Sequence, residues 1–135
     1  MSTLETNKQV VSQYVAAFNQ GDLETLQELF TPNALIQGVL GSANVDKAML
    51  VWQELHEAFN IQLTVEEMIA EGDTVAVRYI ERGTFIGSFR GQSPTGKSYE
   101  LVAIEWFTFQ NGKIHYRWGA RDSASQARQV GLSLA

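Results

Sequence analysis

The sequence predicts an α+β fold in which helices from the first half pack on a mainly antiparallel sheet from the second half. Two observations support this prediction. Apolar residues recur at helical spacing until about residue 60 and then alternate with more polar ones. The second half also contains tight-turn signals between its strands, which favours antiparallel hairpins over a parallel βαβ arrangement. The length of 135 residues is typical of one domain, so we expect a single domain over residues 1–135.

The first two helices are expected before residue 31. An apolar stripe at helical spacing, which includes Tyr14, predicts a helix over residues 4–19. Asp22 is a favoured N-cap residue and predicts the start of a short second helix. Pro32 lies just beyond that helix and is interpreted as its stop signal.

A loop and a third helix complete the helical half. The loop is expected through Gly38 and Gly41. Apolar residues from Val45 to Phe59, with Trp52 among them, then recur at helical spacing and predict the third helix.

Alternating hydrophobicity predicts long strands in the second half, joined by tight turns. Glu71-Gly72-Asp73 is interpreted as one turn, and Asn111-Gly112 is the strongest hairpin signal in the chain. A capping box of Ser123 and Gln126 predicts a short C-terminal helix that ends at Gly131. The strands are expected over about residues 61–69, 75–85, 99–110 and 113–122.

The run from Gly91 to Ser98 matches the Walker A pattern, but its context argues against a nucleotide site. A phosphate-binding loop enters a helix, whose N-terminal amides hold the phosphates. Here the run is followed by Tyr99-Glu100-Leu101-Val102-Ala103, which is typical of a strand. We therefore predict a glycine-rich turn between two antiparallel strands.

The overall charge and the absence of cysteine limit the classes of partner and site. A net charge of −5 disfavours nucleic acid and anionic membranes as partners. Without cysteine the chain has no disulfide and no thiolate metal site, and its His, Asp and Glu residues lack zinc-like spacing, so no metal is expected. The N-terminal residues do not resemble a signal peptide, and a cytoplasmic location is predicted.

Asp122 is the candidate catalytic residue. Strict alternation places it on one face of the last strand with Ile114, Tyr116, Trp118 and Ala120, an otherwise apolar stripe. Burial would raise the pKa of such a carboxyl group and suit it to proton transfer near neutral pH. In the alternative interpretation the strand has already ended, and Asp122 caps the helix that begins at Ser123.

Four aromatic residues are candidates for the lining of a hydrophobic pocket. Tyr14, Trp52, Tyr79 and Trp118 combine large apolar rings with one polar group, as suits a pocket with few hydrogen bonds. The alternative for each is plain packing in the core.

Glu105 is a further candidate because its strand neighbours of the same parity are apolar. It either enters the pocket as a second acid or pairs across the sheet with a cation such as Arg78 or Arg117. A buried acid needs such a partner.

An ordered set of residues over most of the chain resembles the SnoaL-like polyketide (ester) cyclases of the NTF2-like superfamily. The set consists of Asn19-x-Gly21-Asp22-Leu23, Glu71-Gly72-Asp73-Thr74-Val75, Gly83-Thr84-Phe85-Ile86-Gly87, Pro94-Thr95-Gly96-Lys97, Asn111-Gly112-Lys113-Ile114, Trp118, Asp122, Gln129 and Gly131. The resemblance implies a cone-shaped α+β domain that binds a hydrophobic small molecule and pairs as a homodimer through the outer face of its sheet.

The resemblance also implies a mechanism without metal or cofactor. In such cyclases one aspartate near the end of the last strand removes a proton from carbon, and the enolate closes an aldol ring. Asp122 stands at the matching position. The histidine that assists on the preceding strand in the family is absent here, and Tyr79, Trp118 or Arg90 could stabilise the oxyanion instead.

Three functions therefore compete. The first is a cyclase- or isomerase-type enzyme that uses Asp122. The second is a non-catalytic module that binds a ligand or a protein through the same cavity, because one fold hosts many functions. The third is an epoxide hydrolase-like enzyme, for which Asp122, Glu105 and Arg78 would supply two acids and an arginine.

Overall fold

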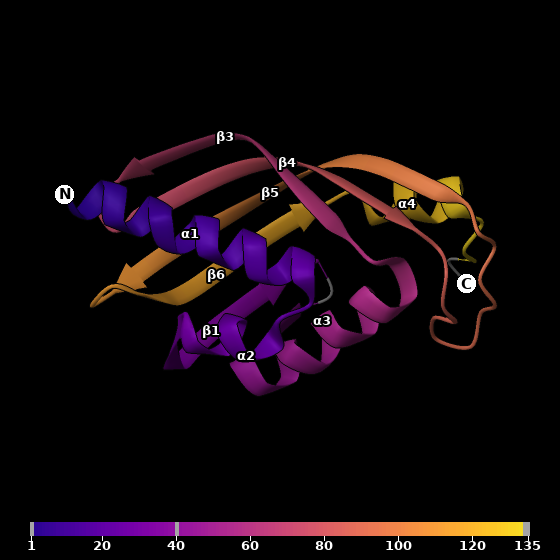
Figure 1. Ribbon diagram of the computed structural model, residues 1–135, viewed down its shortest axis with the longest axis horizontal. Helices are drawn as coiled ribbons and strands as arrows, with labels where there is room; N and C mark the ends of the chain where they lie inside the picture. The colour runs from indigo at the N-terminus through magenta and orange to yellow at the C-terminus, as the bar shows by residue number, and fades with distance from the viewer. Residues whose placement is uncertain (1, 40, 134–135) are drawn as a thin grey trace.

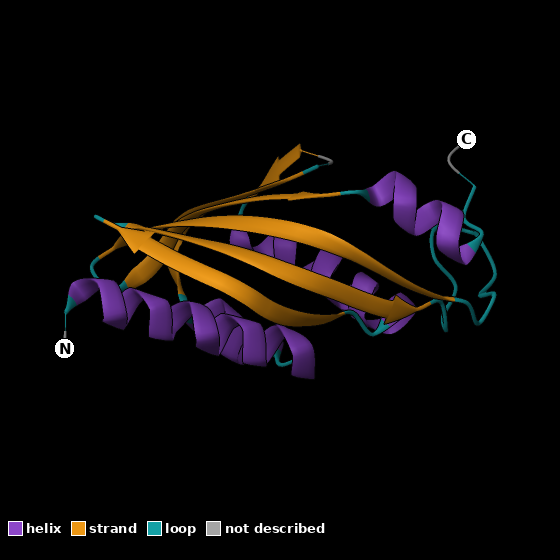
Figure 2. Cartoon of the chain, turned by 90° about the horizontal axis from the view of Figure 1, so that it is seen from above, coloured by secondary structure: helices purple, strands orange, loops and turns teal. Residues whose placement is uncertain are grey.

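A curved sheet covered on one face by helices forms the molecule, as Figures 1 and 2 show. The computed structural model describes residues 2–39 and 41–133. The strands follow the order β2-β1-β6-β5-β4-β3, and every neighbouring pair is antiparallel except β1 with β6. The predicted α+β class is confirmed. In chain order the elements are α1 (Thr3–Gln20), α2 (Leu23–Glu28), β1 (Phe30–Gly38), β2 (Gly41–Ala43), α3 (Val45–Phe59), β3 (Gln62–Glu71), β4 (Thr74–Thr84), β5 (Ser98–Gln110), β6 (Lys113–Arg121) and α4 (Ser123–Val130).

The predicted helices are confirmed, and local signals explain their ends. The Ser2 hydroxyl accepts a hydrogen bond from the Glu5 amide and caps α1, which ends at Gly21 with a φ of 70°. Helix α1 packs against β3 and β4, and α3 packs against β1, so both cover the same concave face. Val11 and Tyr14 of α1 are completely buried there. Among the described residues, no helix is long and apolar enough to cross a membrane.

The predicted loop through Gly38 and Gly41 is wrong, because β1 and β2 occupy this region. Pro32, interpreted as a helix stop, lies inside β1. It is tolerated there because the pairing of β1 with β6 is irregular between Phe30 and Leu35, so the missing amide interrupts no regular ladder.

The predicted turns are confirmed. Asn111 and Gly112 adopt φ values of 52° and 80° in the hairpin between β5 and β6, which only glycine and asparagine adopt readily. Gly72, with a φ of 57°, lies in the turn between β3 and β4. The Walker-like run forms the connection from β4 to the antiparallel β5 and leads into a strand, as predicted.

A β-bulge at the start of β6 decides which of its side chains face the helices. Phe109 pairs with Ile114 but Thr108 pairs with Tyr116, so His115 is an extra residue in the ladder. The extra residue reverses the alternation beyond it. As a result Trp118 lies on the outer face, 38% exposed, and the prediction that it faces the core is wrong.

Candidate functional site

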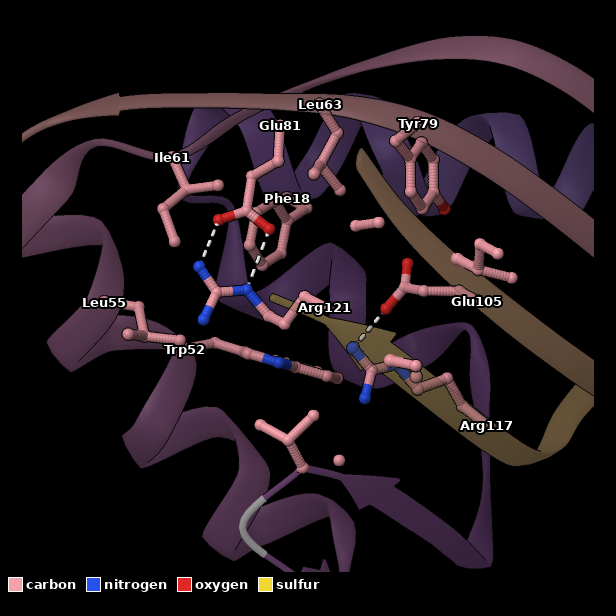
Figure 3. Close-up of a pocket in the computed structure, with 16 residues that line it drawn as sticks. Phe18, Trp52, Leu55, Ile61, Leu63, Tyr79, Glu81, Glu105, Arg117 and Arg121 are labelled. Carbon is pink, nitrogen blue, oxygen red and sulfur yellow. Dashed lines mark hydrogen bonds and ion pairs between the residues drawn. The ribbon is translucent and has the colours of Figure 1, made fainter. Parts of the chain in front are cut away.

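A cavity of about 70 Å³ lies between the sheet and the helices α1 and α3. Its apolar walls come from Phe18 of α1, from Trp52 and Leu55 of α3, from Ile61 just before β3 and from Leu63 in β3. Its polar groups come from β4, β5 and β6, whose inward side chains appear together in Figure 3. The cavity therefore has an apolar helical side and a polar sheet side.

Glu105 and Arg117 form a buried ion pair at the cavity. The Glu105 side chain is only 7% exposed and its Oε2 also accepts a hydrogen bond from the Tyr14 hydroxyl at 3.1 Å. Arg117 donates from Nη1 to the Gln37 carbonyl at 3.3 Å, and its guanidinium lies 5.9 Å from the centre of the Trp52 ring. These contacts hold one carboxylate oxygen of Glu105 in a fixed position.

Three buried polar atoms of this pair and of the nearby Tyr79 have no hydrogen-bond partner among the described residues. They are the Glu105 Oε1, the Tyr79 hydroxyl and the Arg117 Nε. Figure 3 shows the free oxygen of Glu105 turned toward the side of Tyr79. A buried polar group without a partner costs about 1–3 kcal/mol. Glu105 and Tyr79 thus present an unused acceptor and an unused hydroxyl in one place.

A second buried ion pair, between Glu81 and Arg121, borders the same cavity (Figure 3). Arg121 donates from Nε to Glu81 Oε1 at 2.9 Å and from Nη2 to Oε2 at 2.5 Å. The Tyr99 hydroxyl donates to the same Oε2 at 2.6 Å, and Gln126 of α4 accepts from Arg121 Nη2 at 2.9 Å. Both oxygens of Glu81 are occupied, whereas only Oε2 of Glu105 is.

The surroundings keep the arginines charged and the tyrosines neutral. Burial alone would lower the pKa of Arg117, but the charge of Glu105 and its hydrogen bonds outweigh burial and raise it. The same balance, with Glu81 as the partner, raises the pKa of Arg121. Burial, reinforced by the charge of Glu105, raises the pKa of Tyr79 and of Tyr14. Tyr79 therefore remains a hydrogen-bond donor at neutral pH.

The structure brings most of the predicted pocket residues together. Trp52, Tyr79 and Glu105 line the cavity, and Tyr14 lies directly behind Glu105. Glu105 lines the cavity and also pairs with Arg117, so the two predicted positions coincide, and its role as an acid stays a prediction. Trp118 alone lies on the opposite face of the sheet.

Asp122 lies outside the cavity. It is exposed at the end of β6 and caps α4, with its Oδ1 accepting a hydrogen bond from the Ser125 amide at 2.9 Å. The N-cap is thus Asp122 rather than Ser123. This position matches the helix-cap alternative, and a catalytic role for Asp122 stays a prediction.

The residues expected to form an epoxide hydrolase-like site are not assembled. Arg78 faces outward and pairs with Glu66 at 3.4 Å, away from Glu105. Arg90, a candidate to stabilise the oxyanion, pairs with Glu54 at 3.1 Å, and both side chains are about half exposed. Among the residues that the structure describes, no three His, Asp or Glu side chains could hold a metal ion together.

Sequence reasoning did not place Glu81 or Arg121 at the cavity, and it offered Arg117 only as one possible partner of Glu105. Glu81 shares the parity of Val75, Val77 and Tyr79, so the alternation of β4 could have placed it inside. Strict alternation opposite Trp118 and Asp122 would put Arg117 and Arg121 on the outer face, because no sequence signal marks the bulge at His115.

Comparison with known proteins identifies the family. The model of the SnoaL-like polyketide cyclase family matches residues 8–130. No curated protein sequence matches the chain. The structure of IdmH from Streptomyces antibioticus, a candidate polyketide cyclase, is 29% identical with a TM-score of 0.82, and the match covers 93% of this chain and 98% of IdmH.

Two more distant structures share the fold. AclR from Streptomyces galilaeus, a candidate hydroxylase, is 24% identical with a TM-score of 0.88, and the match covers 98% of this chain and 85% of AclR. An LEH-like epoxide hydrolase from M. tuberculosis is 9% identical with a TM-score of 0.78, and the match covers 96% of this chain and 92% of the hydrolase. The helices, the curved open sheet and the short C-terminal helix are those of the NTF2-like fold. Since the family model spans nearly the whole chain, this protein belongs to the SnoaL-like polyketide cyclase family.

Proposed function

We propose that this protein is a cyclase- or isomerase-type enzyme that binds a hydrophobic small molecule in the cavity and performs acid/base chemistry without a cofactor. One observation carries the proposal: Glu105 and Tyr79 both line a largely apolar cavity, and the unpartnered Glu105 Oε1 is turned toward the side of Tyr79, whose hydroxyl is also unpartnered. A base and a hydrogen-bond donor at one place are what proton abstraction next to a carbonyl requires.

In this proposal Glu105 takes the role that the family resemblance gives to Asp122. The Tyr79 hydroxyl donates to a carbonyl oxygen of the substrate, and Glu105 Oε1 removes a proton from the adjacent carbon. In a cyclisation the enolate carbon then bonds to a second carbonyl carbon of the same molecule. Glu105 returns its proton to the new alkoxide, so the protein ends in its starting state. In an isomerisation Glu105 returns the proton to another carbon.

Arg117 and Tyr14 position the base. Both contact Oε2, and Oε1 keeps no hydrogen-bond partner, so it is the oxygen available to act as the base. Because Arg117 stays charged, Glu105 remains next to a fixed positive charge. Exposed Asp122 has no comparable shielding from water.

Deuterium exchange tests the proposal without knowledge of the natural substrate. A panel of aryl methyl ketones and 1,3-diketones is incubated with the protein in D₂O, and loss of the α-proton signal is followed by NMR. We expect Glu105→Gln to slow exchange by about 100-fold or more and Tyr79→Phe by about 100-fold, the usual contributions of a general base and an oxyanion donor.

Glu100→Gln is the matched control. Glu100 lies on the same strand but faces solvent, where it pairs with Arg82. This variant should exchange protons at the wild-type rate. Equal rates for wild type and Glu105→Gln would contradict the proposal, and binding of a ketone without any exchange would favour the non-catalytic binding module.

We also propose that two copies pair through the outer face of the sheet. Trp106 and Trp118 are direct neighbours there, 46% and 38% exposed, and with Val102 and Ile104 they form what we call the outer patch. Contiguous exposed apolar side chains of this kind mark interaction sites. A two-fold pair would bury the same patch on both copies.

A cytoplasmic location also stays a proposal, consistent with the absence of cysteine.

A further inference from the structure

We propose that the two Glu–Arg pairs make the cavity select uncharged ligands, and that Glu81 determines this selectivity by neutralising Arg121. The inference rests on the cavity being the ligand site of the proposed function, and it adds the chemical class of the ligand. Its new element is the pair of Glu81 and Arg121, which the proposed chemistry does not use.

The charges around the cavity cancel. Of the described residues that line it, only Glu81, Glu105, Arg117 and Arg121 are charged, two of each sign. Each carboxylate is bound to one guanidinium, and all four side chains are mostly buried, with exposures between 4% and 22%. A ligand that enters therefore meets polar groups but no uncompensated charge.

An ionised ligand would lose hydration without gaining a counter-ion. Removal of a charge from water into a protein interior costs several kcal/mol unless a partner compensates. The guanidinium of Arg121 already binds both oxygens of Glu81 and the Gln126 amide oxygen. A ligand carboxylate would have to compete with Glu81, which the rigid sheet holds in bidentate contact.

The unpartnered atoms indicate which neutral group fits. Glu105 Oε1 accepts a hydrogen bond, whereas Arg117 Nε donates one and the Tyr79 hydroxyl can donate one. A hydroxyl or enol group satisfies an acceptor and a donor together, and a ketone satisfies the donors. The ligand class is therefore an apolar, uncharged molecule that carries hydroxyl or carbonyl groups.

Glu81 has a distinct role in this arrangement. With the carboxylate replaced by an amide, Arg121 keeps its charge but loses its counter-ion. The cavity then carries a net positive charge and should accept an anion. We therefore predict that the single isosteric substitution Glu81→Gln lets the cavity bind anionic ligands.

Three matched ring compounds test the inference: benzyl alcohol, benzoate and benzylammonium, titrated at neutral pH. The side-chain indole N–H signal of Trp52, which lines the cavity, reports binding by NMR, and the signals of Trp106 and Trp118 on the outer face are internal controls. We expect benzyl alcohol to bind wild type at least tenfold more tightly than either ion. Equal affinities for the three, or no response of Trp52 to the alcohol, would overturn the inference.

The Glu81→Gln variant is the second arm. It should gain at least tenfold in affinity for benzoate while its affinity for benzyl alcohol changes less than threefold, and Glu100→Gln should behave as wild type. Unchanged benzoate binding in a folded Glu81→Gln variant would overturn the role of Glu81. If that variant does not fold, the wild-type titrations still decide whether the cavity selects uncharged ligands.

The outcome is separable from that of the proposed function. Selective binding of the alcohol without proton exchange on any ketone would refute the enzyme and support the selectivity. Exchange that depends on Glu105, together with equal binding of the three compounds, would refute only the selectivity.

Discussion

Gly119 on β6 lies directly opposite Glu105 on β5, and this pairing makes room for the ion pair at the centre of the cavity. Without a side chain at residue 119, the guanidinium of Arg117 folds over the strand and reaches Glu105. A Cβ atom at Gly119 would lie 3.1 Å from the central carbon and two nitrogens of that guanidinium. The position of the Arg117 side chain thus depends on residue 119 being a glycine.

Gly119→Ala should therefore displace Arg117 and weaken its contact with Glu105. We expect a loss of about 1–3 kcal/mol in the free energy of unfolding, as for an extra methyl group in a packed interior. Gly38→Ala is the matched control, because a Cβ there meets Arg117 only at an ordinary contact distance of 3.9 Å. Urea unfolding of both variants tests this, and equal stabilities would contradict the packing described here.

The buried tyrosines should make the fold sensitive to alkali. Burial raises the pKa of Tyr14, Tyr79 and Tyr99 above the usual value of about 10. Below that value both states keep the proton and stability is unaffected. Above it only the unfolded state releases the proton, so stability falls by up to about 1.4 kcal/mol per pH unit for each tyrosine.

Phenolate absorbance and circular dichroism recorded together test this behaviour. Of the four tyrosines in the sequence, these three should ionise only as the native dichroism is lost. Ionisation of all four with an intact native spectrum would contradict their burial.

The sequence predicted the helices, the hairpins and the class of fold because each has a local signal. The N-cap residue Asp22, the Asn111-Gly112 turn and the alternation of β4 are all visible in the chain. The short edge strand β2 and the strand β1 were missed, since Pro32 imitates a helix stop and their pairing is determined by distant segments.

The candidate site was predictable only in part, for a single geometric reason. Tyr79 and Glu105 lie on strands with regular alternation, and parity places both correctly. On β6 the extra residue His115 reverses the parity, which exchanges Trp118 for Arg117 at the inner face. Arg117 was among the possible partners of Glu105 from the sequence, but only the register of the bulged strand places its side chain on the inner face.

Asp122 should contribute to stability through the cap of α4. Asp122→Ala removes the acceptor for the Ser125 amide and should lower the free energy of unfolding by about 0.5–2 kcal/mol. Asp122→Asn retains an acceptor of the same geometry, so its stability should remain close to wild type. Thermal unfolding of the two variants checks this, and equal losses would argue against the cap.

The outer patch should control association. Trp106→Glu places a charge at the centre of the apolar face and should convert a dimer into a monomer of 15.0 kDa in sedimentation equilibrium. Lys113→Glu, on an exposed position at the start of β6, is the control and should remain dimeric. A wild-type mass of 15.0 kDa would contradict the proposed pair.

The role of Glu105 is tested by comparing Glu105→Gln with Asp122→Asn on one ketone whose α-proton wild type exchanges. Both substitutions are isosteric, and both leave the carboxylate's position filled. If the cavity is the site, the exchange rate falls by about 100-fold or more in Glu105→Gln and stays within about threefold of wild type in Asp122→Asn. The reverse result, with Asp122→Asn inactive and Glu105→Gln active, would contradict the account and restore the role that the family resemblance gives to Asp122.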